Sequence, residues 1–244
     1  MDRETIEKLL ALNREFYASF ARPFADSRSL SDPALTSILP HIPQRARVLD
    51  VGCGNGRLAR LLGRERPGAS YTGIDAVSEL VEVARAQNAD LETITSQFHV
   101  ADITQLDWLL FIDSLPIDVI VCLAVLHHIP SFDLRACILR EMAGLLAPGG
   151  IVILSTWQFL DSDRLRRKIV DWTEVGLVEE VLEQGDYLLD WKRGGRGLRY
   201  CHLVDEAEMG RLAAESGMHV RTTFRAGGRE GNLSLFAVLG RKNG

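Results

Sequence analysis

The stretch Val48-Leu49-Asp50-Val51-Gly52-Cys53-Gly54-Asn55-Gly56 decides the fold of this 244-residue chain. A short apolar run that contains one acid passes into three glycines at alternate positions, and a helical pattern follows over 58–62. Glycine permits a tight turn between a strand and a helix and leaves no side chain where a ligand must approach. The stretch therefore predicts a buried strand, a ligand-binding turn and a helix.

The same alternation of short apolar runs and helical patterns continues along the chain. Further short apolar runs occur at 71–74, 98–100, 117–123 and 151–156, and helical patterns separate them. Alternating strands and helices predict an α/β fold, with a doubly wound, mostly parallel sheet of seven strands. Two β-rich segments, 219–224 and 233–239, are expected to close this sheet as an antiparallel C-terminal hairpin.

We expect one domain over 1–244, divided into four parts. An N-terminal cap (1–44) contains a helix that ends before Pro23, and a ligand-binding core occupies 45–157. A substrate-side insertion (158–204) follows, in which the spacing of apolar residues from Ile169 to Leu182 predicts one or two amphipathic helices before the glycine-rich 193–197. The last part, 205–244, is expected to hold a helix that Asp205 caps, and then the hairpin.

Composition narrows the class of protein. With 46% hydrophobic residues the chain can bury one substantial core. No apolar run approaches the roughly 20 residues of a membrane helix, and charges open the N-terminus, so we expect a soluble, cytoplasmic protein without membrane contact. Four scattered cysteines without zinc-ligand spacing predict no metal site.

Charge is distributed unevenly along the sequence. Residues 1–190 carry 18 Lys and Arg against 28 Asp and Glu, whereas residues 191–244 carry 10 against 5. A basic C-terminal end suits local binding of phosphate groups, and an ordinary solvated basic face explains it equally well. Both interpretations stay open.

Three acids follow the first three predicted strands. Asp75 ends the second strand, 25 residues after Asp50, where a carboxylate can accept hydrogen bonds from ribose hydroxyls. Asp102 ends the third strand, a position that suits an adenine amino group. Acids beside the glycine turn would repel a pyrophosphate and attract a cationic sulfonium. The set therefore favours S-adenosylmethionine (SAM) over a dinucleotide.

These motifs over about 45–157, with the turn Pro148-Gly149-Gly150, resemble the class I SAM-dependent methyltransferases. The resemblance implies a Rossmann-like methyltransferase fold and the cofactor SAM. It also implies a set of cofactor-binding residues: Asp50, Gly52, Cys53, Gly54, Asn55 and Gly56 at the methionine part, Asp75 and Ala76 at the ribose, Ala101, Asp102 and Ile103 at the adenine, Leu123 and Ala124 at the methyl end, and Tyr17 and Arg28 from the cap.

Segments outside the core, together with one segment inside it, resemble one subgroup, the tRNA wobble-uridine carboxymethyl methyltransferases, which include part of the AlkB-homologue fusion proteins. The matching segments are Phe16-Tyr17 through Arg28, Ala124-Val125-Leu126-His127-His128, Gly185-Asp186 through Trp191-Lys192, and Arg199-Tyr200-Cys201-His202. Asp190, Cys201 and Leu233 depart from the subgroup's pattern, at positions where it has Pro, Tyr and Trp.

This resemblance implies that the chain methylates the carboxylate of a 5-carboxymethyl uridine in a tRNA anticodon loop. It also implies a possible small zinc-binding activator subunit as partner. Arg199, Tyr200 and His202 are then catalytic residues that hold the carboxylate or the base, and Trp157, Trp191, Lys192, Arg193, Arg196 and His128 bind the acceptor. In the alternative interpretation, Arg199 and His202 are internal polar ties and Trp191 belongs to the core.

A different acceptor would need different chemistry. A phenol or carbon acid requires a general base, for which His127 is our catalytic candidate, whereas a carboxylate is already ionised near neutral pH. Pocket lining without a base role stays open for His127 and His128. Two further functions remain alternatives: a small-molecule O- or C-methyltransferase of the quinone or natural-product kind, and a SAM-binding interaction protein without turnover.

Overall fold

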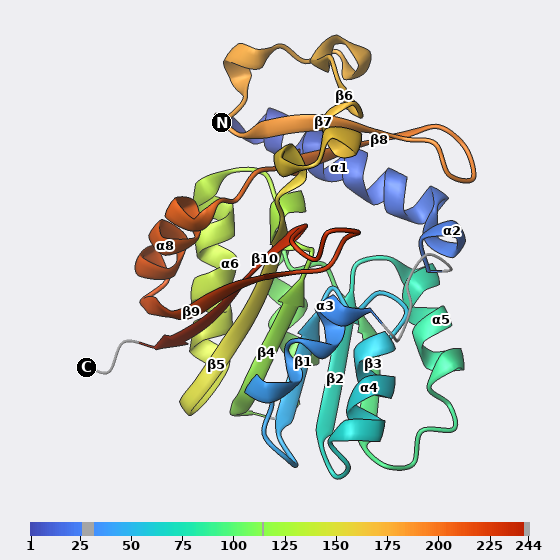
Figure 1. Ribbon diagram of the computed structural model, residues 1–244, viewed down its shortest axis with the longest axis vertical. Coiled ribbons are helices and arrows are strands. Elements are labelled where there is room, and N and C mark those ends of the chain that lie inside the picture. Colours follow the sequence, from blue (N-terminus) through green and yellow to red (C-terminus); the bar gives the residue numbers. More distant parts are fainter. Residues whose placement is uncertain (26–31, 114, 242–244) are drawn as a thin grey trace.

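A seven-stranded sheet in the order β3-β2-β1-β4-β5-β10-β9 forms the centre of the computed structural model, which describes residues 1–25, 32–113 and 115–241 (Figure 1). β1 to β5 run parallel, and β10 runs antiparallel to β5 and β9. This confirms the predicted Rossmann-like α/β fold with antiparallel C-terminal strands. The strands are β1 Arg47–Val51, β2 Ser70–Asp75, β3 Thr95–Val100, β4 Ile117–Leu123, β5 Leu146–Trp157, β9 Met218–Ala226 and β10 Ser234–Arg241.

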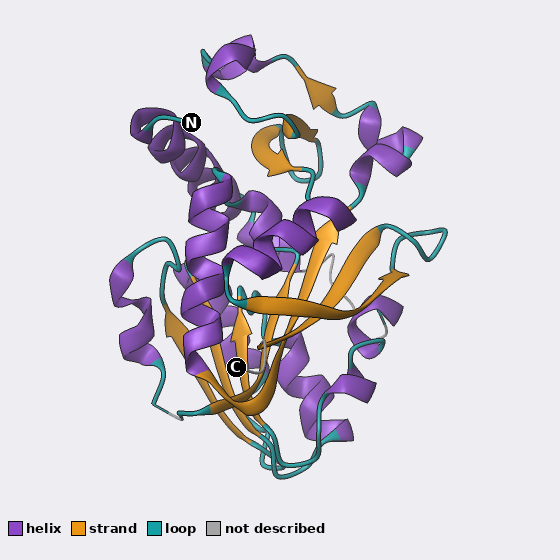
Figure 2. Ribbon diagram, turned by 90° about the vertical axis from the view of Figure 1, so that its left-hand side faces the viewer, coloured by secondary structure: helices purple, strands orange, loops and turns teal. Residues whose placement is uncertain are grey.

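Helices cover both faces of the sheet (Figure 2). One apolar core joins the sheet to α6, α8 and η2, and a second joins its other face to α3, α4 and α5. Burial on both faces explains why β1 and β4 read as nearly continuous apolar runs. The helices are α3 Pro33–Thr36, η1 Leu39–His41, α4 Arg57–Glu65, α5 Ser78–Gln87, η2 Leu106–Phe111, α6 Phe132–Leu145 and α8 Glu206–Glu215.

The C-terminal helix begins where the sequence predicted. The Asp205 side chain accepts a hydrogen bond from the backbone N–H of Glu208 at 2.8 Å, which caps α8. Gly217 follows the helix in the left-handed conformation, with φ +73°. In the described part of the chain, no helix is both long enough and apolar enough to cross a bilayer.

The insertion forms a small antiparallel sheet, so the prediction of amphipathic helices there was wrong. Strands β6 (Ile169–Val170), β7 (Asp186–Trp191) and β8 (Gly197–His202) make up this sheet, and the glycine-rich 193–197 forms the turn between β7 and β8. Only short helical turns accompany them in the described chain: η4 Phe159–Asp161, α7 Asp163–Arg166, η5 Trp172–Val175 and η6 Glu179–Val181. The apolar side chains are buried by packing onto the N-terminal helix, which residue spacing alone does not reveal.

That N-terminal helix, α1 (Arg3–Ser19), and the β7–β8 hairpin lie together over the carboxyl ends of the parallel strands; we call this pair the roof (Figure 1). Buried Asn13 joins the two parts, because its amide donates to the carbonyls of His128 and Tyr200 at 3.0 and 3.2 Å and accepts from the Tyr200 N–H at 2.9 Å. Beyond α1, the chain continues into α2 (Ala21–Ala25). The roof thus covers the edge where α/β proteins of this kind bind ligands.

Candidate functional site

The floor of the cleft under the roof is the turn between β1 and α4. A Cβ on Gly52 would lie 2.2 Å from Val125, and one on Gly56 would lie 2.5 Å from Asn88, so these glycines permit close packing. A Cβ on Gly54 would meet no atom within 4 Å and would enter the cleft that Gly54 lines. Gly54 is therefore the position where a ligand can approach the backbone.

Asp75, at the end of β2, holds this turn in place. Its carboxylate accepts hydrogen bonds from the backbone N–H of Gly54 at 2.9 Å and of Val77 at 3.0 Å. Burial raises the pKa of Asp75, and these two hydrogen bonds oppose that shift. A carboxylate has about four acceptor positions. Asp75 can therefore also accept two ribose hydroxyls from a nucleoside in the cleft, and it fits SAM in this respect.

Asp50 lies behind the turn rather than in the wall of the cleft, which corrects its predicted contact with the cofactor. It is buried, and Tyr71 donates its hydroxyl to the carboxylate at 2.6 Å. Burial raises the pKa of Asp50 to about 7, against the lowering effect of that hydrogen bond. Asp50 is therefore only partly ionised at neutral pH. Because Asp102 pairs with Arg14, the attraction of a sulfonium depends mainly on Asp75.

Most of the other predicted cofactor residues meet in this cleft. Gly56 is set back in the packing between α4 and α5, and Arg28 lies outside the described residues. The predicted residues that line the cleft are Tyr17, Gly52, Cys53, Gly54, Asn55, Asp75, Ala76, Ala101, Asp102, Ile103, Leu123 and Ala124.

One wall of the cleft was not predicted from the sequence: α1 supplies it through Leu10, Asn13 and Arg14 beside Tyr17. Arg14 donates to the Asp102 carboxylate at 3.1 Å, so the helix is tied across the predicted adenine position. Positions 10, 13, 14 and 17 share one helix face, and this spacing was readable in the sequence. The further lining residues are Arg57, Val77, Leu80, Thr104, Val125 and Ile129.

Of the two histidines after β4, only His128 lines the cleft, so the placement of His127 does not support its predicted role as general base. In the short helix η3 (Leu126–His128), His127 is fully buried with its ring 5.0 Å from that of Trp157, and it lies outside the wall of the cleft. His128 lines the cleft, where its Nε2 meets the Tyr17 hydroxyl at 2.7 Å and its Nδ1 meets the Tyr200 carbonyl at 2.9 Å. Consecutive residues of a 3₁₀ turn point in different directions, so only one of the pair can face the ligand.

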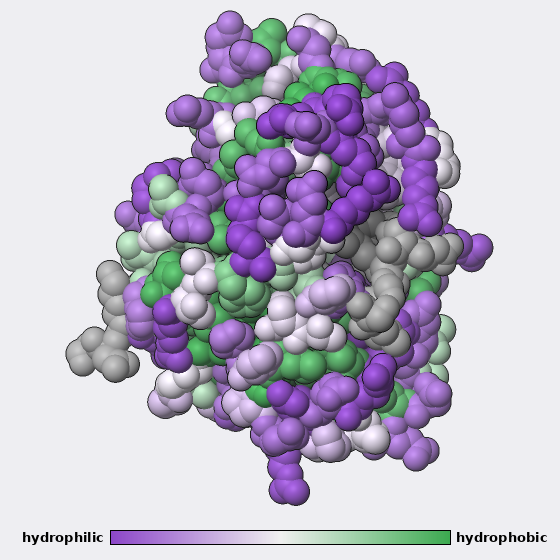
Figure 3. Space-filling model, viewed as in Figure 1, coloured by the Kyte–Doolittle hydropathy of each residue, from purple (hydrophilic) through white to green (hydrophobic). Residues whose placement is uncertain are grey.

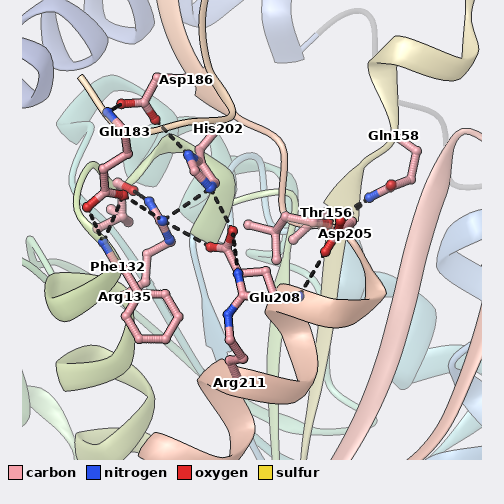
Figure 4. A network of polar contacts seen from close by, with 12 residues as sticks. Phe132, Arg135, Thr156, Gln158, Glu183, Asp186, His202, Asp205, Glu208 and Arg211 are labelled. Atoms are coloured by element: carbon pink, nitrogen blue, oxygen red, sulfur yellow. Dashed lines mark hydrogen bonds and ion pairs between the residues drawn. The ribbon is translucent and has the colours of Figure 1, made fainter. Parts of the chain in front are cut away.

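Tyr200 and His202 are internal ties, and their placement does not support the predicted catalytic contacts. Both are buried: the Tyr200 hydroxyl donates to Asp186 at 2.7 Å, and His202 lies 2.6 Å from Asp186 and 2.9 Å from Glu208. Figure 4 shows Arg135 from α6 among the same carboxylates, in contact with Glu183 and Glu208. The network joins α6, α8 and the hairpin, as the alternative interpretation of His202 held.

Arg199 lies directly behind the cleft. Its side chain is 3% exposed, and its guanidinium carbon lies 4.5 Å from the ring centroid of Trp157 and 5.3 Å from those of Phe16 and Trp191. Nη1 donates to the Tyr17 hydroxyl at 3.5 Å. The Arg199 guanidinium thus contacts one residue of the cleft lining, Tyr17.

Most of the hairpin residues predicted to bind RNA already contact other side chains of the protein. Trp191 packs edge-to-face on Phe16 and donates to the Arg193 carbonyl, Lys192 pairs with Asp190 at 3.0 Å, and Arg196 pairs with Glu174 at 2.8 Å. Hydrophilic residues predominate on this upper part of the molecule in Figure 3. Three cations, Lys192, Arg193 and Arg196, were predicted to bind the acceptor. Acidic side chains pair with Lys192 and Arg196, which weakens the case for phosphate binding.

Comparison with known proteins gives one family match and a large set of structural relatives. The model of a family described as "Methyltransferase domain" matches residues 21–223. Among solved structures, a SAM-dependent methyltransferase of Methanosarcina mazei has a TM-score of 0.64 at 22% identity and covers 83% of this chain and 95% of its own. A 1,6-didemethyltoxoflavin-N1-methyltransferase of Burkholderia thailandensis has a TM-score of 0.65 at 17% identity and covers 100% of this chain and 91% of its own. These two likenesses concern the fold.

Curated relatives share sequence with part of this chain. A ubiquinone biosynthesis O-methyltransferase of Xylella fastidiosa is 37% identical over 148 residues, which are 57% of this chain and 56% of the relative. The chain thus spans little more than half of that relative's length. A protein of the same name from Vibrio vulnificus is 29% identical over 184 residues, covering 68% and 72%.

We predict that Asp186→Asn destabilises the fold most at acidic pH. Burial lowers the pKa of His202, but hydrogen bonds to Asp186 and Glu208 outweigh it, so the pKa is raised above 6.5. This contribution is complete below 6.5 and is lost as pH rises through the folded-state pKa. Breaking a buried pair costs about 3–5 kcal/mol. Urea unfolding from pH 5.5 to 9 measures the loss, with exposed Glu215→Gln as control; an equal loss at every pH contradicts the prediction.

Proposed function

This chain belongs to the family of methyltransferase domains, and on that premise we propose that it transfers a methyl group from SAM to a small-molecule acceptor. The observation that carries the proposal is the meeting of the open Gly54 backbone with the Asp75 carboxylate in one cleft. The turn receives the amino-acid part of the donor, and Asp75 accepts the ribose hydroxyls. Leu123 and Ala124 line the same cleft, and in this proposal they contact the methyl end of the donor.

The protein's part in the reaction is alignment. SAM supplies a methyl group on a cationic sulfur, which an acceptor displaces in line, so the rate depends on holding the two reactants in position. Asp75 places negative charge near the donor, and α1 covers the donor through Leu10 and Tyr17.

A small acceptor is better supported than a tRNA. The curated relatives above are named for ubiquinone biosynthesis and O-methyl transfer. Tyr200 and His202, which the tRNA hypothesis needs at the substrate, are committed to the buried network, and acids compensate Lys192 and Arg196. The tRNA acceptor and the zinc-binding activator subunit stay predictions from motif resemblance, and a binding protein without turnover remains the third hypothesis.

Loss of the Asp75 carboxylate should weaken donor binding. In Asp75→Asn, one amide N–H would face the backbone N–H of Gly54 or Val77, and an acceptor for ribose would be lost. Hydrogen bonds to charged groups contribute about 1.5–3 kcal/mol, so we expect the Kd for S-adenosylhomocysteine (SAH) to rise about 10- to 100-fold. Calorimetry measures this, with exposed Asp107→Asn as the matched control. Unchanged affinity in Asp75→Asn would remove Asp75 from the site.

The acceptor class is decided by following labelled methyl groups. Methyl-labelled SAM is incubated with a set of catechols and hydroquinones, and in parallel with tRNA from a strain that lacks wobble-ester formation. We expect alkali-stable methyl ethers from the first set, and no product from Gly54→Val, whose side chain would enter the cleft. A label in tRNA that mild alkali releases as methanol contradicts the proposal. Tight SAM binding without any product supports the binding protein.

A further inference from the structure

We propose that Tyr17 and His128 form a proton relay that ionises a hydroxyl of the acceptor, with Arg199 as the positioning residue behind them. The inference rests on the proposed function and makes it more specific, since it assigns the acceptor to the phenols and enols. Tyr17 and His128 both line the cleft and lie 2.7 Å apart, Oη to Nε2. Arg199 contacts the same Tyr17 oxygen from the far side.

The surroundings of His128 set the direction in which the proton moves. Nδ1 lies 2.9 Å from the Tyr200 carbonyl oxygen, which can only accept, so Nδ1 carries a hydrogen. In the neutral ring Nε2 is then the acceptor, and the Tyr17 hydroxyl donates to it. Asn13 holds the same carbonyl from α1, so the helix that carries Tyr17 is fixed against the strand that orients the imidazole. The relay is thus oriented before any ligand binds.

Arg199 supplies a positive charge at the oxygen end of the relay. It is 3% exposed, its Nε has no hydrogen-bond partner, and within the described part of the chain it forms no ion pair. Three aromatic rings surround it. A buried guanidinium without an anion favours the appearance of negative charge nearby, because that charge offsets part of its desolvation. An acceptor oxygen that loses its proton beside Tyr17 provides this charge.

The proposed step moves one proton to His128 and one methyl group to the acceptor oxygen. The acceptor hydroxyl gives its proton to the Tyr17 oxygen while Tyr17 passes its own to Nε2 of His128, which becomes an imidazolium. The ionised oxygen forms a bond to the methyl carbon of SAM, and the carbon–sulfur bond breaks with its electron pair on sulfur. The products are a methyl ether, SAH and one proton, which His128 releases to water.

Several other groups act on this pair. On β8, the Cys201 thiol lies 3.5 Å from Nδ1, and on η3 the His127 ring lies 4.2 Å from the His128 ring. Behind Arg199, Lys168 has a pKa lowered by burial and then by the Arg199 charge. On the cleft side, Arg14 and Asp102 compensate each other. Because Arg199 meets the relay at the Tyr17 oxygen, its charge acts at the end where the acceptor binds.

The direct test is the ionisation of a bound phenol. 4-Nitrophenol and 4-nitrocatechol are titrated by absorbance in the complex of the protein with SAH. We expect the bound phenol to ionise about tenfold more readily than in solution, and Tyr17→Phe and His128→Asn to abolish this shift; the Asn side chain can still donate to the Tyr200 carbonyl. Arg199→Met should reduce the shift. Tyr187→Phe, a half-buried tyrosine on β7, is the matched control.

Turnover provides a second readout that a structural role would not move. General-base catalysis contributes about 10²- to 10⁴-fold, so Tyr17→Phe should lower kcat at least 100-fold for catechol and far less for the acidic 4-nitrocatechol. The control Tyr187→Phe, which lies outside the lining of the cleft, should keep the parent kcat for both phenols and the parent affinity for SAH. The inference is overturned if both phenols lose rate equally, if no bound phenol ionises, or if only carboxylic acids are methylated. Failure of the parent protein to bind SAH would instead overturn the proposed function.

Discussion

The buried side chain of Asn13 is the tie on which the geometry of the site depends. One amide satisfies a carbonyl of η3 and both backbone groups of Tyr200, and it brings together segments that are more than 100 residues apart in the chain. Buried polar groups that lose such partners cost about 1–3 kcal/mol each, so the arrangement is strongly specified. As a consequence, α1 lies across the cleft, Tyr17 meets His128, and Arg199 lies behind both.

Charge is divided between the two ends of the cleft. Asp75 lies at the nucleoside end, where Asp102 pairs with Arg14, whereas Arg199 stands behind the acceptor end without a counter-ion in the described chain. Asp50 contributes less charge than its position suggests, because burial raises its pKa to about 7. A cationic donor and an acceptor that becomes anionic are both favoured by this division, since each meets the opposite sign.

Resemblance to a binding motif does not by itself place a residue at the substrate. The segment Arg199-Tyr200-Cys201-His202 resembles a substrate-binding motif, yet here its strand alternates between two environments. Arg199 reaches towards Tyr17, whereas Tyr200 and His202 end in the network with Asp186. With Arg135, this network fastens the hairpin to α6 and α8. Residues that resemble a binding motif therefore serve here to hold the roof.

Sequence alone determined the α/β class, the glycine turn, the acids after β2 and β3 and the cap of α8, because each follows from local spacing and backbone chemistry. Most of the predicted cofactor residues also line one cleft, since the carboxyl ends of parallel strands meet at one edge. Only the tertiary structure decided that the insertion is a hairpin, that His128 rather than His127 faces the ligand, and that Asp50 lies behind the turn. Those outcomes depend on which surfaces pack against one another, and long-range packing leaves no periodic signal in the chain.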